Sequence, residues 1–313
     1  MIRSIVRLLA LVCIGVCAAE NANAQELVPR AYVITPTDTN AFILAYSQVA
    51  GGLEFSGGVP ISGVDANFDL GVASYYHSLG VFGHSANFTL SVPYGHGYVN
   101  ADVFGAPREA YRSGFLDLAA RFAVNLIGGP EMAAKEFAKW QQNVLLGMSL
   151  SIVPPTGQYN STNLLNLGTN RWAFKPELGY SQRFGHWVLD AYLGGWFFTT
   201  NPEYFSRNMY FPSVRDQWEA PVGEFETHLS YDFAPRLWVS VDANFYWGGI
   251  TYTNGAQNPG TNQQNSRFGF TASVPLTKAQ SLKFSYANGA YVRYGGNFRT
   301  ITVAWQYGWY GGF

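Results

Sequence analysis

Two stretches in the second half of the chain decide the fold: residues 224–233 read EFETHLSYDF, and residues 239–247 read VSVDANFYW. In both, nearly every second residue is apolar or aromatic, and most of the residues between them are polar or charged. A repeat of two residues is that of a β-strand with one apolar and one polar side. Each stretch is about as long as a tilted strand must be to cross a lipid bilayer. These stretches therefore predict membrane-spanning strands.

The same alternation recurs from about Asn40 onward and gives about twelve segments. Their approximate centres are Leu44, Leu70, Leu90, Ala120, Gly147, Leu178, Ala191, Thr227, Ala243, Phe270, Ser285 and Val303. We predict an all-β protein, a transmembrane antiparallel β-barrel of about 12 strands over residues 40–313. An even number of strands brings both termini to the periplasmic side, and the long polar stretches at 156–171, 199–217 and 254–265 then lie outside the cell.

The composition is typical of a barrel in lipid. Aromatic residues make up 17% of the chain and charged residues only 12%, and there are 34 glycines. An apolar outer band, aromatic girdles at both membrane interfaces and tight turns favour this mixture. The predicted girdle residues are Tyr75, Tyr76, Tyr94, Trp172, Trp187, Trp196 and Trp309. A formal net charge of -1 indicates neither a nucleic-acid partner nor a polybasic lipid-binding patch.

The first residues are typical of a secretory signal peptide. Arg3 and Arg7 lie beside an apolar run, and the small residues of the sequence ANA at 22–24 form a cleavage site, so we expect cleavage near Ala24. The predicted organisation is a signal peptide over 1–24, an N-terminal periplasmic or plug segment over 25–39, and the barrel over 40–313. Both cysteines precede the cleavage site, so the mature chain does not depend on disulfides.

One segment departs from the strand pattern. Residues 130–140 read PEMAAKEFAKW, which is rich in helix formers with a proline near the first turn. We predict one short helix in a periplasmic turn, with Phe137 and Trp140 packed against the rim of the barrel. The alternative is an element that docks a partner.

The last strand carries a second membrane signal. Ile301, Val303, Trp305, Tyr307 and Trp309 alternate, and the sequence ends at Phe313. A terminal aromatic residue on an amphipathic strand is the pattern that outer-membrane barrels present to their assembly machinery. With the signal peptide, this strand predicts a cell outer membrane location and a lipid bilayer as the surroundings of the mature chain.

The sequence also resembles a known family. The stretches PPTGQY at 154–159, LGTNRW at 167–172 and KPELG at 175–179 are similar to the central motif of the MetA-pathway of phenol degradation family. Further matches are Gly114 with Asp117 and Arg121, NLIGGP at 125–130 and WVSVD at 238–242. The resemblance covers essentially the whole mature chain. It implies an outer-membrane transporter-like barrel that admits hydrophobic or aromatic compounds, and it supplies no site residue.

The polar sides of the predicted strands face the lumen of a closed barrel. The candidate pore-lining residues there are Asp117, Arg121, Lys175, Glu177, Glu226, His228, Asp242, Arg267 and Lys283. Asp190, Glu224 and Arg299 belong to the same polar side. Opposite charges across such a lumen either pair into a partial plug or line a small pore, and the sequence leaves both open.

An enzyme is the competing class, because some outer-membrane barrels are lipid-modifying enzymes with a Ser/His pair. His228 lies two residues from Ser230, but neighbours on one side of a strand are roughly 7 Å apart and need not bond. We therefore expect no catalytic residue. There is no metal-binding motif and no glycine-rich phosphate cradle, so no cofactor is expected.

The predicted function is that of a porin-like channel for the passive uptake of small hydrophobic or aromatic solutes. The alternatives are a general porin for small polar solutes, a lipid-modifying enzyme, and a structural barrel with a plugged lumen. Tyr204, Tyr210 and Phe211 in an outer loop are equally consistent with a greasy entry patch and with ordinary loop packing. The substrate, the pore diameter, the oligomeric state and the place of residues 25–39 do not follow from the sequence.

Overall fold

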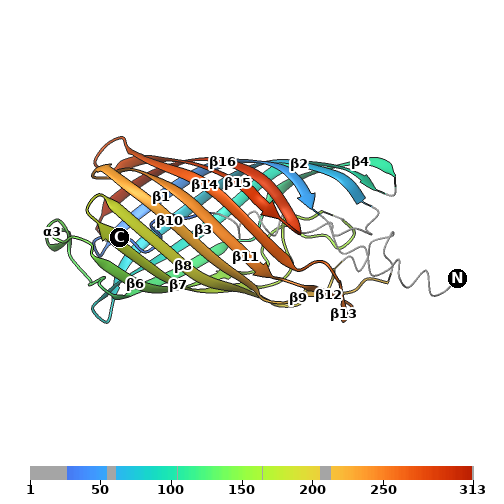
Figure 1. Cartoon of the computed structure of the whole chain (residues 1–313), viewed down its shortest axis with the longest axis horizontal. Helices are drawn as coiled ribbons and strands as arrows, with labels where there is room; N and C mark the ends of the chain where they lie inside the picture. The colour runs from blue at the N-terminus through green and yellow to red at the C-terminus, as the bar shows by residue number, and fades with distance from the viewer. Residues whose placement is uncertain (1–26, 55–60, 104, 164, 205–212, 312–313) are drawn as a thin grey trace.

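A computed structural model describes residues 27–311 of the chain, apart from 55–60, 104, 164 and 205–212. It is a closed antiparallel β-barrel (Figure 1), which confirms the predicted fold class. The barrel strands are β1 (Thr39–Glu54), β2 (Ile61–Val81), β3 (His84–Val103), β5 (Ala119–Ile127), β6 (Val144–Val153), β7 (Ala173–Phe184), β8 (Trp187–Phe198), β10 (Val222–Ala234), β11 (Leu237–Gly248), β14 (Gln263–Pro275), β15 (Gln280–Val292) and β16 (Gly295–Tyr310). Every predicted strand centre lies within one of these strands.

The sheet has 13 strands in all, because one place in the barrel wall is shared by two strands. β4 (Ala106–Phe115) pairs with residues 94–103 of β3, and β5 pairs with residues 86–91 of the same strand. The pairing of β2 with β3 closes the 12-strand barrel. Residues 116–118 therefore interrupt a strand that would otherwise run the full height of the wall.

The alternation of side chains places apolar residues outside and polar residues in the lumen. On β11, Val239, Val241 and Phe245 are exposed on the outer surface, whereas Asp242 and Asn244 are buried on the inner side. In lipid, outward-facing apolar side chains remain in an apolar medium, while the inner polar groups pair with one another. The predicted sides of β10 and β11 are confirmed.

Four residues lie on a different side from the one predicted. Leu116, which a continuous alternation over 116–126 places on the same side as Ala120 and Phe122, is buried among inner residues. The strand breaks at 116–118, and the period of two does not carry across the break. Tyr76 and Trp196 line the lumen instead of a girdle. Arg299 is exposed and alternates with the lumen residues Phe298 and Thr300, so it faces outward. Single residues follow the local strand register, which the sequence fixes only to within a few positions.

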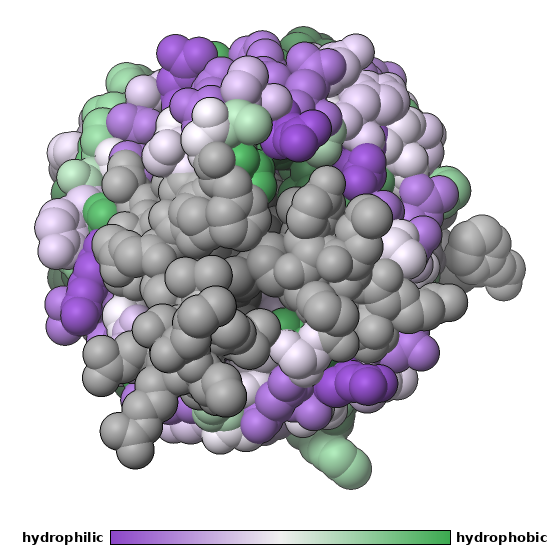
Figure 2. Space-filling view, turned by 90° about the vertical axis from the view of Figure 1, so that its right-hand side faces the viewer, coloured by the Kyte–Doolittle hydropathy of each residue, from purple (hydrophilic) through white to green (hydrophobic). Residues whose placement is uncertain are grey.

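The two ends of the barrel differ, as Figure 1 shows. The loop end carries the long connections at 154–172, 199–221 and 249–262. A small sheet of β9 (Gln217–Glu219), β12 (Thr251–Thr253) and β13 (Ala256–Gln257) lies there. Figure 2 looks onto this end, where hydrophilic residues form much of the rim. The turn end carries the short connections and the C-terminal end of β16.

The turn end also carries the short helix that the sequence predicts. α3 spans only Ala134–Phe137, and Pro130 forms an isolated bridge with His84. Phe137 and Trp140 stack at 6.0 Å between ring centroids and pack against a buried cluster of Ile34, Met132 and Leu145. None of the helices in the described part of the chain is long and apolar enough to cross a membrane.

The N-terminal segment enters the lumen. Residues 27–31, 33 and 35 line the cavity described below, and the chain reaches the turn end at Asp38, where β1 begins. The predicted signal peptide over 1–24 and the terminal Phe313 lie outside the described residues, as do Tyr210 and Phe211. Tyr204 is described and is buried rather than exposed for entry.

Candidate functional site in the barrel lumen

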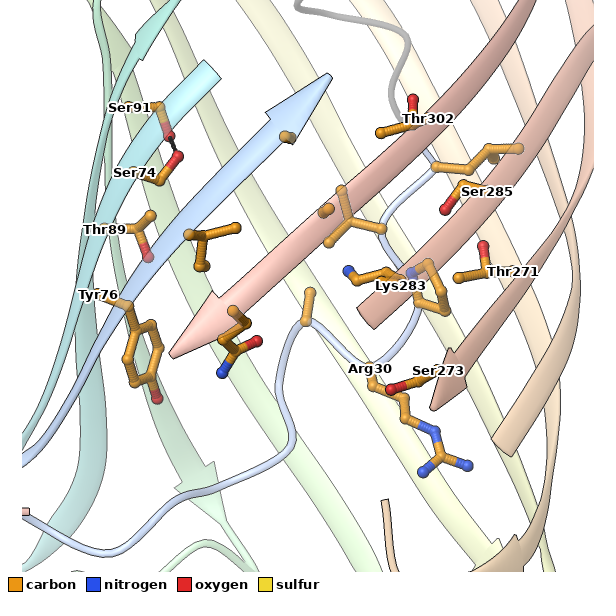
Figure 3. A pocket seen from close by; sticks show the side chains of 18 of the residues that line it. Arg30, Ser74, Tyr76, Thr89, Ser91, Thr271, Ser273, Lys283, Ser285 and Thr302 are labelled. Atoms are coloured by element: carbon orange, nitrogen blue, oxygen red, sulfur yellow. Dashed lines mark hydrogen bonds between the residues drawn. The ribbon is translucent and has the colours of Figure 1, made fainter. Parts of the chain in front are cut away.

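The lumen contains a cavity of about 1020 Å³. The strands around it fall into two groups according to what their inner side chains contact, and we call these groups the packed half and the open half of the barrel wall. The packed half consists of β5, β6, β7, β8, β10 and β11, whose inner side chains contact Arg30 and Tyr32 of the N-terminal segment and each other. The open half consists of β1, β2, β3, β14, β15 and β16, whose side chains face the cavity (Figure 3).

The packed half is held by a buried network of charges centred on Lys175. Its ammonium nitrogen lies 2.8 Å from Glu177 Oε2, 3.1 Å from Glu224 Oε2 and 3.6 Å from Glu226 Oε1. Arg121 adds a second cation 3.6 Å from Glu177 Oε1. Trp196 donates an indole hydrogen bond of 3.0 Å to Glu224. Buried carboxylates are tolerated only when paired in this way, because the loss of hydration is otherwise too costly.

His228 continues this network and does not form a catalytic triad. Its Nδ1 lies 2.9 Å from Asp242 Oδ1, and its Nε2 lies 3.5 Å from Glu226 Oε2. The second ring nitrogen thus meets a carboxylate where a triad would place a serine hydroxyl. Ser230, two residues away, accepts a 3.0 Å hydrogen bond from Nε of Arg30. The ring is fully buried and acts as a cross-link between strands.

Tyr32 of the N-terminal segment fits into a slot made by two glycines. Gly147 and Gly179 are opposite each other on β6 and β7, with their missing side chains toward the lumen. A Cβ atom on Gly179 would lie 2.0 Å from Cε2 of Tyr32, and one on Gly147 would lie 2.5 Å from Cδ1. Only glycine leaves room for the ring, so the two residues shape the slot.

Polar contacts hold both the hydroxyl group and the backbone carbonyl of Tyr32. The hydroxyl lies 3.0 Å from Oγ of Ser149 and donates to Oε1 of Glu177 at 2.9 Å, and Asn125 donates to the Tyr32 carbonyl at 3.2 Å. Burial, followed by the charge of Glu177, raises the pKa of the Tyr32 hydroxyl, so the group stays protonated and can donate.

Arg30 anchors the same segment to the turn-end side of the packed half. Its Nη1 lies 2.8 Å from Asp232 Oδ1, and its guanidinium stacks 4.5 Å over the Trp238 ring. Its backbone N–H donates to Asp190 at 3.2 Å, and the next N–H, of Ala31, donates to the Tyr192 hydroxyl at 3.0 Å. The segment is thus fixed by side chains from several strands.

The open half has a simpler wall. Hydroxyl side chains face the cavity from all six strands, among them Ser47, Ser74, Thr89, Ser91, Thr271, Ser273, Ser285 and Thr302. Some pair across strands, as Ser74 does with Ser91 at 2.8 Å and Ser47 with Thr302 at 2.7 Å. Between them lie alanine, valine and leucine side chains. The wall therefore offers weak polar contacts on a largely aliphatic surface.

An apolar cluster lies at the loop end of the lumen, on the inner side of β16, β1 and β2. Leu165 and Leu167 of the 154–172 loop pack with Leu116, Leu70 and Phe298. The cluster lies above the cavity, because Leu70 and Phe298 also line the cavity wall.

Asp117, in the strand interruption, holds this loop in place. Its carboxylate accepts hydrogen bonds from the Gly157 N–H at 2.6 Å, from the Thr169 N–H at 2.8 Å and from the Thr169 hydroxyl at 2.7 Å. The Phe115 carbonyl accepts a further bond from the Gln158 N–H at 2.9 Å. One buried carboxylate thus links the broken strand to both ends of the loop segment that carries the leucines.

The nine candidate pore-lining residues separate into two sets. Six line the cavity, and these are Arg121, Lys175, Glu177, Glu226, Arg267 and Lys283. Three are buried away from it, and these are Asp117, His228 and Asp242. The influence of any of them on passage stays a prediction.

Sequence reasoning missed the residues that fill the packed half. Arg30 and Tyr32 gave no signal, because a segment that precedes the first strand has no period to place it. Gly147 and Gly179 did carry a sequence signal, because isolated glycines on the inner side of two strands indicate that another group approaches closely.

The fold defines a class, that of 12-strand antiparallel β-barrels, and solved outer-membrane proteins share it. The solved COG4313 outer membrane channel from Pseudomonas putida F1 is similar to this chain with a TM-score of 0.75 and 18% identity, covering 91% of this chain and 100% of that one. The transport unit of the autotransporter AIDA-I from Escherichia coli is similar with a TM-score of 0.51 and 9% identity, covering 94% and 96%. Both likenesses concern the fold alone.

The family follows from the sequence. Residues 50–305 match the family described as "Putative MetA-pathway of phenol degradation", and the chain belongs to this family. This confirms the resemblance seen in the motifs. Among curated proteins, no sequence matches the chain.

Proposed function

We propose that the chain is an outer-membrane channel for the passive uptake of small hydrophobic compounds, aromatic ones among them. The loop end would then face outward and the turn end the periplasm, after removal of the signal peptide near Ala24. Membership of the family and the outer-membrane channel fold support this location.

The apolar cluster at the loop end carries the proposal. A sugar, with hydroxyls over its whole surface, would lose hydration against Leu165, Leu167 and Phe298, which costs several kcal/mol without compensating hydrogen bonds. An apolar solute gains from the same contacts. The cavity beneath, with its aliphatic and hydroxyl wall, is of the size and character of a small-molecule site.

Uptake by intact cells tests the proposal. Cells that express the chain should take up the fluorescent hydrophobic probe N-phenyl-1-naphthylamine faster than cells without it, because an outer membrane normally excludes it. Proteoliposomes should swell no faster than protein-free liposomes in arabinose. Faster swelling with unchanged probe uptake would establish the general porin instead.

A pair of matched variants locates the barrier. Replacing both Leu165 and Leu167 by Ser should admit arabinose, because the cluster then tolerates water. Replacing both by Met keeps the cluster apolar and should leave arabinose excluded. If both double variants exclude the sugar, the cluster is not the barrier.

A further inference from the structure

Lys283 differs from the other charged residues that line the cavity. Glu177 and Glu226 lie beside Lys175, and Asp232 beside Arg30. The remaining cations also have partners, which are Glu177 for Arg121, Asp232 for Arg183, the carbonyls of Thr277 and Lys278 for Arg236, and the Phe298 carbonyl for Arg267. Within the described part of the chain, the ammonium group of Lys283 has neither an ion pair nor a hydrogen bond.

The strand register surrounds this ammonium group with small side chains. Ser273 on β14 and Ala304 on β16 are directly opposite Lys283, and Ser281 and Ser285 lie two residues away on the same side of β15. All four line the cavity together with Lys283, and Figure 3 labels Ser273, Ser285 and Lys283 there. Directly opposite side chains lie about 5 Å apart, and same-side neighbours about 7 Å. These groups are therefore within reach of one small ligand.

The hydroxyls around Lys283 are also available. In the described residues, the side chains of Ser273, Ser281 and Ser285 make no hydrogen bond. The carboxylate of Asp242, two strands away on β11, is already held by His228 at 2.9 Å and by the Thr271 hydroxyl at 2.8 Å. An ammonium group with free hydroxyl donors beside it matches a carboxylate, which only accepts hydrogen bonds.

The neighbouring wall suits an apolar body. Ile43 and Ala45 on β1 and Val72 on β2 face the same cavity. Ala45 is directly opposite Ala304 across the β1–β16 pairing, so the aliphatic surface begins beside Lys283.

We propose that Lys283 binds the anionic head group of the solute, so that the cavity prefers amphipathic monoanions such as aromatic carboxylates over neutral or cationic molecules of the same size. This rests on the proposed channel function and names the class of its substrate. Ser273, Ser281 and Ser285 add donors to the head group, and the β1 and β2 wall contacts the body.

Three ligands of one shape and different charge test the proposal. Benzoate, benzyl alcohol and benzylamine carry charges of -1, 0 and +1 at neutral pH. Isothermal titration of the full chain in a non-ionic detergent should give the tightest binding for benzoate. Adding sodium chloride to the wild-type chain should weaken the binding of benzoate and not that of benzyl alcohol. Equal affinities for benzoate and benzyl alcohol, or a preference for benzylamine, would overturn the proposal.

Matched variants assign the effect to Lys283. Lys283→Met should weaken benzoate binding about tenfold, as expected for one charge-assisted contact, and leave benzyl alcohol unchanged. Lys283→Arg should keep most of the preference, and Lys278→Met, in the exposed turn before β15, should have no effect. A shift in electrophoretic mobility on heating reports that each variant is folded. A Lys283→Met variant that keeps the preference for benzoate contradicts the site.

The two proposals fail in different ways. If benzyl alcohol binds and the hydrophobic probe enters cells while benzoate has no advantage, only the role of Lys283 is wrong. If no ligand binds and the probe does not enter, the channel function itself is wrong.

Discussion

The packed and open halves of the lumen share one backbone geometry and differ in what their side chains contact. In the packed half, Lys175 faces three carboxylates and Tyr32 fills a slot between strands. In the open half, Lys283 faces the cavity with no protein partner in the described residues. The difference teaches that a charged lumen can serve two purposes. One half uses charge to hold the barrel together, and the other leaves space and free donors for a solute.

The largest expected difference in the free energy of unfolding comes from making the same substitution, lysine to methionine, in each half. Lys175→Met leaves Glu224 and Glu226 without their shared cation, and the unpaired buried charge should lower the free energy of unfolding by about 3 kcal/mol. Lys283→Met removes a charge that no protein group pairs with and should change it by less than about 0.5 kcal/mol. Urea unfolding in detergent measures both. Similar losses for the two variants would break the distinction between the halves.

The glycine slot should be nearly as sensitive. Gly179→Ala places a Cβ atom against the Tyr32 ring and should cost about 2 kcal/mol through overpacking. It should also expose the N-terminal segment to protease. In a Tyr32→Ala background the same substitution should cost little, because the ring is gone, and this double-mutant cycle isolates the contact. Equal costs in both backgrounds would mean that the slot does not hold Tyr32.

Filling the open half should affect passage more than stability. Ala304→Phe adds a ring to the cavity wall beside Ala45 and should slow uptake of the hydrophobic probe severalfold, with a change of about 1 kcal/mol or less in the free energy of unfolding. Ala304→Ser keeps the space and serves as the control. Unchanged uptake in the phenylalanine variant would show that the solute does not pass this wall.

The smallest expected difference in stability is between two variants that each lose one hydroxyl, one from each half. Ser149→Ala removes a buried partner of Tyr32 and should cost about 1 kcal/mol. Ser91→Ala removes the bond to Ser74 at the cavity wall, where water can replace it, and should cost less than about 0.5 kcal/mol. Thermal unfolding of the two variants under one condition compares them. A larger loss for Ser91→Ala would reverse the assignment.

Strand number and the side each residue faces on β10 and β11 could be predicted from the sequence, because the period of two is a property of the backbone itself. The same local logic failed at Leu116 and at Tyr76. A strand break shifts the period, and of two adjacent aromatic residues such as Tyr75 and Tyr76 only one can face the lipid. The short helix α3 was predicted in place and kind, because residues 130–140 are rich in helix formers.

The sequence by itself determined that this chain forms a membrane barrel of about twelve strands with a charged inner side, and its motifs identified the family. The tertiary structure decided which of the inner charged side chains form ion pairs and which remain without a partner among the described residues. Which cation meets which carboxylate depends on the closure of the sheet and on the path of residues 27–38, both of which bring together groups far apart in the chain. Lys175 and Lys283 look alike on their strands. Their neighbours in space differ, because β7 and β10 bring three carboxylates to Lys175, whereas Lys283 lies opposite Ser273 and Ala304.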